Sequence, residues 1–193
     1  MIPAVLSTVL VLTAGCSDAD SSTETSVTVE QRRTAINSTM EHLDSGRGRE
    51  ALAIISTLAK RDPHSAVTQE TYATVLLAHS LQLNKPGDEA KGIALRKLAL
   101  DAYITACKNS NSPGLLQLST AQLAQMLGEN DVAALYYEQA HNSNVNDGRA
   151  AFFLTQLHLL GKEWNQAKHW ASESLLRDPN EPYTLLSAAL AEA

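Results

Sequence analysis

The chain has 193 residues, and 44% of them are hydrophobic, which is enough for the core of one domain or of a short array of repeats. Fifteen Lys and Arg stand against 21 Asp and Glu, so the formal net charge is −6. Because a nucleic-acid partner requires a basic face that neutralises phosphates, this charge balance disfavours nucleic acid as the partner.

The first fifteen residues, MIPAVLSTVLVLTAG, form an apolar run with the length of a signal peptide, too short to span a bilayer. Residues 13–16, TAGC, resemble the lipobox of bacterial lipoproteins. The resemblance implies that Cys16 becomes the lipidated first residue of the mature protein, with palmitate among its acyl chains. The alternative is an ordinary cleaved secretion signal in which Cys16 has no special role.

The residue after Cys16 indicates where such a lipoprotein would reside. Ser17 stands where an Asp would mark retention in the inner membrane, so we expect a lipid-anchored protein of the bacterial cell envelope, in the outer membrane and facing the periplasm. Lipidation of Cys16 would leave Cys107 as the one free thiol, which excludes an intrachain disulfide.

Residues 17–30 are mostly Ser, Thr and acids, so they cannot bury enough apolar surface to fold alone. We therefore predict three parts in the chain: a lipoprotein signal peptide at 1–15, a disordered tether at 16–30 that begins with lipidated Cys16, and a helical domain at 31–193.

The hydrophobic spacing after the tether is helical throughout. A first helix begins at about residue 31 and ends at the Ser-Gly-Arg-Gly break of residues 45–48, and a second ends at Asp62-Pro63, because a proline disfavours helix in the residue before it. Further helices are predicted at about 65–83, 88–107, 113–127, 131–141, 147–160, 164–177 and 183–192.

Small residues recur on the second helix of each predicted pair, at Ala51, Ala99, Ala133 and Ala167. The last three are 34 residues apart, whereas Ala51 and Ala99 are 48 apart, so we place an insertion of 14 residues in the turn between the third and fourth helices. Aromatic residues follow two of these alanines by one helical turn, as Tyr103 and Tyr137. Across 31–193 the pattern resembles the tetratricopeptide repeat (TPR) family. The resemblance implies an all-α, right-handed superhelical stack of about four antiparallel hairpins, a TPR-like α-solenoid, with a C-terminal capping helix.

No pattern of catalytic or metal-binding residues stands out. Glu138 and His141 have the spacing of a di-iron helix, but a di-iron site needs a second such pair, so we interpret them as a solvated helix face and predict no metal and no cofactor. His158 is interpreted as a half-buried histidine with no carboxylate beside it, and Cys107 as a packed thiol rather than a nucleophile. No nucleophile motif or phosphate-binding loop is present, so we predict that the protein is not an enzyme.

The remaining candidate site is the concave face, which in the family is lined by the first helix of each hairpin. The resemblance maps that face onto a mixture of aliphatic, aromatic and amide side chains, namely Ile36, Met40, Leu77, Leu115, Leu118, Gln122, Gln125, Phe152, Gln156 and Leu159. Apolar anchors combined with amides suit an extended or helical peptide. The alternative is that several of these residues fill the groove against one another.

Two functions follow from this sequence. The first is a membrane-anchored scaffold or assembly factor for protein–protein interaction, which binds a peptide or protein on its concave face. The second is an accessory subunit of a cell-wall or envelope enzyme system, whose repeat array binds a glycan or another small ligand.

Overall fold

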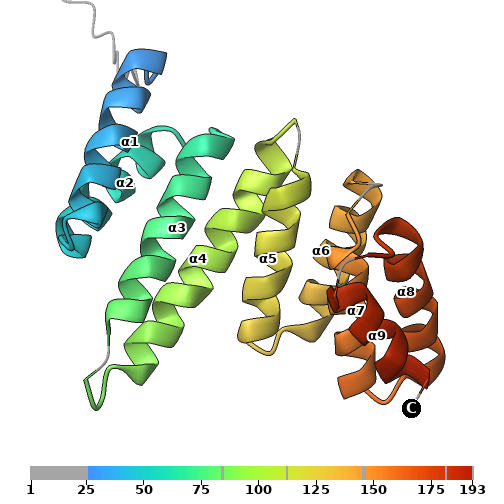
Figure 1. Cartoon of the computed structure of the whole chain (residues 1–193). Coiled ribbons are helices and arrows are strands. Elements are labelled where there is room, and N and C mark those ends of the chain that lie inside the picture. The colour runs from blue at the N-terminus through green and yellow to red at the C-terminus, as the bar shows by residue number, and fades with distance from the viewer. Residues whose placement is uncertain (1–25, 84, 112, 145–146, 181, 193) are drawn as a thin grey trace, which may run out of the picture.

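The computed structural model describes residues 26–83, 85–111, 113–144, 147–180 and 182–192. The signal segment, Cys16 and most of the predicted tether lie outside this range. The described residues form nine helices and no strand, which confirms the all-α prediction (Figure 1). The helices are α1 (Val29–Asp44), α2 (Gly48–Arg61), α3 (Ala66–Gln82), α4 (Glu89–Asn109), α5 (Gly114–Met126), α6 (Asn130–Ser143), α7 (Arg149–Leu160), α8 (Trp164–Arg177) and α9 (Pro182–Glu192). None of these described helices is long and apolar enough to cross a membrane.

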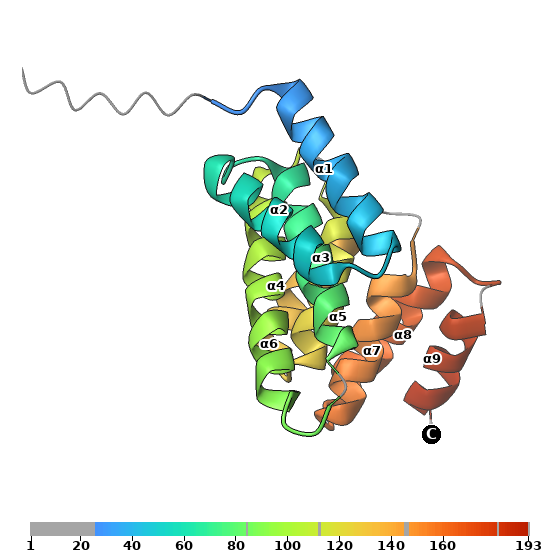
Figure 2. The same cartoon turned by 90° about the vertical axis from the view of Figure 1, so that its left-hand side faces the viewer.

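Successive helices pair into four antiparallel hairpins, α1–α2, α3–α4, α5–α6 and α7–α8, and each hairpin contacts the next one along the chain. The ninth helix packs against α7 and α8 at the C-terminal end, as the predicted cap would. Figure 1 shows the hairpins side by side in one row, from α1 and α2 to α9, and Figure 2 shows the same stack from the side on which α1 and α2 lie. Contacts between neighbours along the chain are what define a helical solenoid.

The recurring small residues lie where helices approach most closely. Ala51, Ala99, Ala133 and Ala167 are all fully buried. Tyr137, one turn after Ala133, is also fully buried, and its ring stacks on Phe153 of α7 with 5.3 Å between the ring centroids. The small residue lets the two helices of a hairpin meet, and the aromatic ring fills the space toward the next hairpin. The packing roles predicted from the 34-residue period are confirmed.

Local sequence signals account for the first helix boundaries. Thr28 accepts a hydrogen bond from the Gln31 backbone N–H, and the Gln31 side chain accepts one from the Thr28 N–H, so a capping box starts α1. Asp62, which ends α2 before Pro63, accepts hydrogen bonds from Arg32 on α1 (2.5 Å) and Thr68 on α3 (3.1 Å). The Arg32 guanidinium is the main reason that the pKa of Asp62 lies below its usual value. The carboxylate of Asp62, at the end of α2, thus links α1, α2 and α3.

The 14 additional residues are not confined to the turn between α3 and α4, so that prediction is wrong. Helix α3 has 17 residues where α5 has 13, and α4 has 21 where α6 has 14. The connection 83–88 has six residues where 127–129 has three. Most of the insertion therefore lengthens helices, because a regular helix satisfies its backbone hydrogen bonds and a long loop does not. We call the described residues 79–83 and 85–95 the extended tip, which projects beyond the α5–α6 turn in Figure 1.

The turn before the second helix shows the same departure. Gly46 and Gly128 have left-handed backbones (φ +71° and +77°), and Lys162 adopts the same region at φ +60°. Ala94, which precedes Gly128 by the 34-residue period, lies inside α4 instead. In the extended tip the left-handed position has moved to Gly87 (φ +95°).

Candidate functional site

Four of the ten residues predicted for the concave face meet in one groove. Leu115, Leu118 and Gln122 lie on α5 at spacings of three and four, which places them on one face of the helix. Phe152 on α7 lies on the opposite side of the same groove, whose volume is about 400 Å³. We call this feature the α5–α7 groove.

The α5–α7 groove combines an exposed anchor with a buried floor. Leu115 is 66% exposed, whereas Leu118 is 8% exposed. Phe152 contacts Phe153 edge to face at 5.2 Å, and Phe153 stacks on buried Tyr137. The groove wall is thus tied to the interface between the third and fourth hairpins, so its shape is fixed by core packing.

Polar groups stand at the rim of the groove. Ser119 and Arg149 line it together with Gln122. The Arg149 Nε–H donates to both carboxylate oxygens of Asp147 (3.0 Å each), and an Nη2–H donates to one of them at 2.6 Å. These bonds lower the pKa of Asp147 and hold the guanidinium in place. A ligand in the groove would meet amide, hydroxyl and guanidinium groups around an apolar centre.

The other six predicted residues do not line this groove. Ile36 and Leu77 are partly buried against the hydrophobic core. Gln125 accepts a hydrogen bond from the Tyr137 hydroxyl (2.7 Å), so it serves the third hairpin itself. Met40 is 38% exposed, on α1. Gln156 and Leu159 are half-buried on α7.

Sequence reasoning missed three lining residues, Ser119, Arg149 and Phe153. Arg149 precedes Phe152 by three residues on α7, so helical spacing alone was a usable signal for it. No comparable signal marked Phe153, because its neighbour Phe152 fitted the family position.

The interpretation of Glu138 and His141 as a solvated face is wrong for the histidine. Glu138 is exposed, but His141 is only 5% exposed, and its ring contacts that of Trp170 on α8 edge to face (5.1 Å between ring centroids). Its Nε2 lies 3.6 Å from a carboxylate oxygen of Glu173. Burial lowers the pKa of His141, and the nearby Arg177 lowers it further. Within the described ranges, no group of three or more His, Cys, Asp or Glu could hold a metal ion.

His158 is half-buried as expected, but a carboxylate does lie beside it. Its Nδ1 is 2.5 Å from a carboxylate oxygen of Glu163, in the turn that follows α7. The prediction missed this pair because the left-handed backbone at Lys162 turns the chain back toward α7. Cys107 is a buried thiol that shares a hydrogen bond with Thr120 on α5 (3.3 Å), and burial raises its pKa. A packed thiol is thus confirmed, since a raised pKa disfavours the thiolate.

The stack of hairpins with its alanine and tyrosine packing positions is the TPR fold. The sequence matches no protein-family model, and no curated protein matches it. Solved structures do match it. A thermophilic TPR protein of Thermus thermophilus superposes with a TM-score of 0.58 at 20% identity, over 83% of this chain and 81% of that one.

Two further solved structures support the same fold. The MamA protein gives a TM-score of 0.67 at 14% identity, over 84% of this chain and 81% of that one. YrrB, described as a TPR protein with an unusual peptide-binding site, gives a TM-score of 0.62 at 17% identity, over 81% of this chain and 74% of that one. At these identities the similarity shows the fold alone, so the likeness confirms the TPR-like α-solenoid and leaves the function to other evidence.

Proposed function

We propose that this protein is a scaffold or assembly factor that binds a peptide or protein segment in the α5–α7 groove. The observation that carries the proposal is the convergence of Leu115, Leu118, Gln122 and Phe152, which were predicted as concave-face residues, around one open groove. A leucine 66% exposed at its edge offers an anchor that the fold itself does not use.

The chemistry of the α5–α7 groove favours a peptide over a sugar. Phe152 and the leucines would receive one or two apolar side chains, and Gln122 would hydrogen bond to the peptide backbone. Glycan recognition by stacking needs exposed aromatic faces, whereas Phe153 is committed to Tyr137. The glycan-binding accessory subunit therefore remains the second choice.

We further propose that the scaffold is anchored to the envelope through lipidated Cys16, in the outer membrane facing the periplasm. The support is the apolar run of residues 1–15 and the lipobox-like 13–16 before Cys16. Replacing Cys16 by Ser should move the protein from the membrane fraction to the soluble fraction. A variant that stays in the membrane fraction would contradict the anchor.

The groove can be tested by comparing partners recovered with the wild type and with Leu115→Asp. Leu115 is better suited than Leu118, because a charge at the buried Leu118 would unfold the hairpin. The matched control is Leu176→Asp, because Leu176 is 78% exposed on α8, outside the groove. Quantitative mass spectrometry after in vivo crosslinking should show partners lost from Leu115→Asp and kept by Leu176→Asp.

The proposal fails if Leu115→Asp folds, as judged by circular dichroism and melting temperature, and keeps every partner. Thermal stabilisation by peptidoglycan fragments, lost in Phe152→Ala, would instead favour the accessory-subunit function. The two functions are thus separated by the ligand that responds to groove substitutions.

A further inference from the structure

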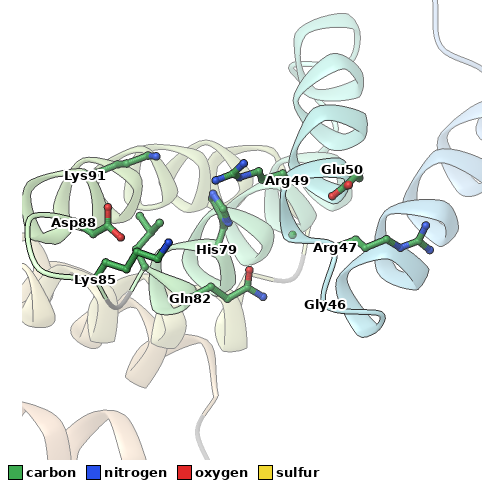
Figure 3. Close-up of a pocket in the computed structure, with 11 residues that line it drawn as sticks. Gly46, Arg47, Arg49, Glu50, His79, Gln82, Lys85, Asp88 and Lys91 are labelled. Carbon is green, nitrogen blue, oxygen red and sulfur yellow. The ribbon is translucent and has the colours of Figure 1, made fainter.

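A second pocket, of about 480 Å³, lies between the α1–α2 turn and the extended tip (Figure 3). One wall is formed by residues 46–50, which are the end of the α1–α2 turn and the start of α2, and the other by α3, the α3–α4 turn and the start of α4. This pocket is separate from the α5–α7 groove, with which it shares no lining residue.

The additional residues of the second hairpin build this pocket. If α3 had the 13 residues of α5 it would end at Ala78, and if α4 had the 14 residues of α6 it would begin at Arg96. The residues that the second hairpin contributes all lie beyond those limits, namely His79, Gln82, Leu83, Lys85, Asp88 and Lys91. A hairpin of regular length would leave the α1–α2 turn without this wall.

The pocket is basic although the chain is acidic. Four cationic side chains line it, Arg47, Arg49, Lys85 and Lys91, against two carboxylates, Glu50 and Asp88. Neither Arg49 nor Lys91 forms an ion pair with another described residue. In Figure 3 the charged ends of Arg49 and Lys91 point toward the same space beside His79, whereas Arg47 points away. Even without Arg47, cationic side chains outnumber carboxylates around this space in a chain of net charge −6, which favours an anion.

The first turn of α2 borders the same space. Helix α2 begins at Gly48, and its N-cap residue, Arg47, makes no side-chain capping hydrogen bond. A Cβ at Gly48 would come within 2.6 Å of Gln82 Oε1, so the absence of a side chain lets the extended tip approach the first turn. The N–H groups and the positive end of the helix dipole at such a start attract anions.

One buried side chain of α3 gives the pocket a fixed wall. His79 is 9% exposed and lines the pocket, and its Nδ1 is buried with no hydrogen-bond partner among the described residues. This nitrogen lies 3.3 Å from the position that a Cβ on Gly48 would occupy, so the ring sits against the first turn of α2. The imidazole therefore ties α3 to the start of α2 and lies beside any anion that the cationic side chains hold.

From these observations we propose that the pocket binds a phosphate-bearing anion. Arg49 supplies a planar fork for two phosphate oxygens, Lys91 supplies a point charge, and the first turn of α2 supplies N–H donors. The ring of His79 forms the wall of the pocket on the side of α3. The net positive lining suits a single phosphate group, and Glu50 and Asp88 disfavour larger polyanions.

The test is calorimetric titration of the full chain with inorganic phosphate, and flotation of the Cys16→Ser chain, which carries no lipid anchor, with vesicles of phosphatidylglycerol or phosphatidylcholine. The double variant Arg49→Gln, Lys91→Gln should weaken phosphate binding roughly tenfold or more. The control, Arg33→Gln, Lys168→Gln, removes two exposed cations outside the pocket and should bind as the wild type does. All four positions are exposed, so both proteins should keep their melting temperature.

The two sources of phosphate give different results. Saturable binding of inorganic phosphate that depends on Arg49 and Lys91 supports a soluble ligand. Flotation with phosphatidylglycerol alone, with the same dependence, supports a lipid headgroup. In either case the imidazole resonances of His79 should shift on binding in the NMR spectrum. Binding of neither probe, or equal binding by the double variant and the wild type, would overturn the proposal.

Discussion

The second and third hairpins share their packing positions but differ in length. Ala99 and Ala133 are both fully buried, and Tyr103 and Tyr137 follow them by one turn. Helix α4 nevertheless has 21 residues and α6 has 14, and α4 leaves Ile93 45% exposed. The comparison shows that the 34-residue spacing predicts which positions pack between helices but does not predict how long the helices are. The additional residues of the second hairpin are not needed for packing between hairpins, and some of them line the basic pocket.

The largest difference between the hairpins should appear when their tyrosines are truncated. Tyr137→Ala removes a fully buried ring stacked on Phe153 and should lower the free energy of unfolding by about 3–5 kcal/mol. Tyr103→Ala should cost less, because Tyr103 is 7% exposed and its hydroxyl meets Thr74 near the surface. Urea unfolding followed by circular dichroism measures both. Equal losses of unfolding free energy would mean that the position of the tyrosine in the repeat, and not its local packing, determines how much it stabilises the fold.

Enlarging an alanine tests the frame itself. Ala133→Leu forces a larger side chain between α5 and α6 and should cost about 1–3 kcal/mol. Ala94→Leu, at a frame position that lies exposed inside α4, should change stability by less than about 0.5 kcal/mol. The same urea titration compares the two variants. A large loss for Ala94→Leu would show that the start of α4 is packed as the regular frame requires.

The left-handed turn of the fourth hairpin offers a smaller effect of opposite sign. Lys162 has φ +60°, a region that costs a residue with a Cβ about 1 kcal/mol, so Lys162→Gly should raise the unfolding free energy by up to about 1 kcal/mol. Gly128→Ala in the third hairpin, at φ +77°, should lower it by about the same amount. Thermal melts of the two variants check the pair. A melting temperature lowered by Lys162→Gly would contradict the expected strain.

The smallest expected effect is a pH dependence of the third and fourth hairpins. Burial holds the pKa of His141 below its ordinary value of 6.5, with Arg177 lowering it and Glu173 raising it. Below about pH 6.5 the unfolded chain therefore binds a proton that the folded chain does not, so stability falls as the pH decreases from 8 to 6. His141→Asn should show a weaker decrease in urea midpoint over that range. Asp62 and Asp147, whose pKa values are lowered, act at more acidic pH and do not obscure it. Equal slopes for variant and wild type would contradict this role.

The fold could be predicted from the sequence because it depends on local and periodic signals. Alanines 34 residues apart and the tyrosines one turn later specify which helix faces meet, and Asp-Pro and Gly specify where hairpins break. The structure confirmed these features without exception at Ala51, Ala99, Ala133 and Ala167.

The sites were harder to predict, because they depend on residues distant in sequence. The basic pocket brings Arg49 together with Lys91, and no periodicity relates a turn in one hairpin to the tip of the next. The burial of His141 depends on Trp170, a residue of the next hairpin. For the α5–α7 groove the resemblance supplied four lining residues, whereas the other six predicted residues do not line it.

Cys107 sits at the boundary between the long hairpin and the regular ones. Its thiol is 9% exposed and faces Thr120 across the α4–α5 interface, and burial raises its pKa. A thiol reagent can reach it only when these two helices separate. The rate at which a thiol reagent labels Cys107 therefore reports how often α4 and α5 separate at the middle of the solenoid, and no residue has to be substituted to measure it.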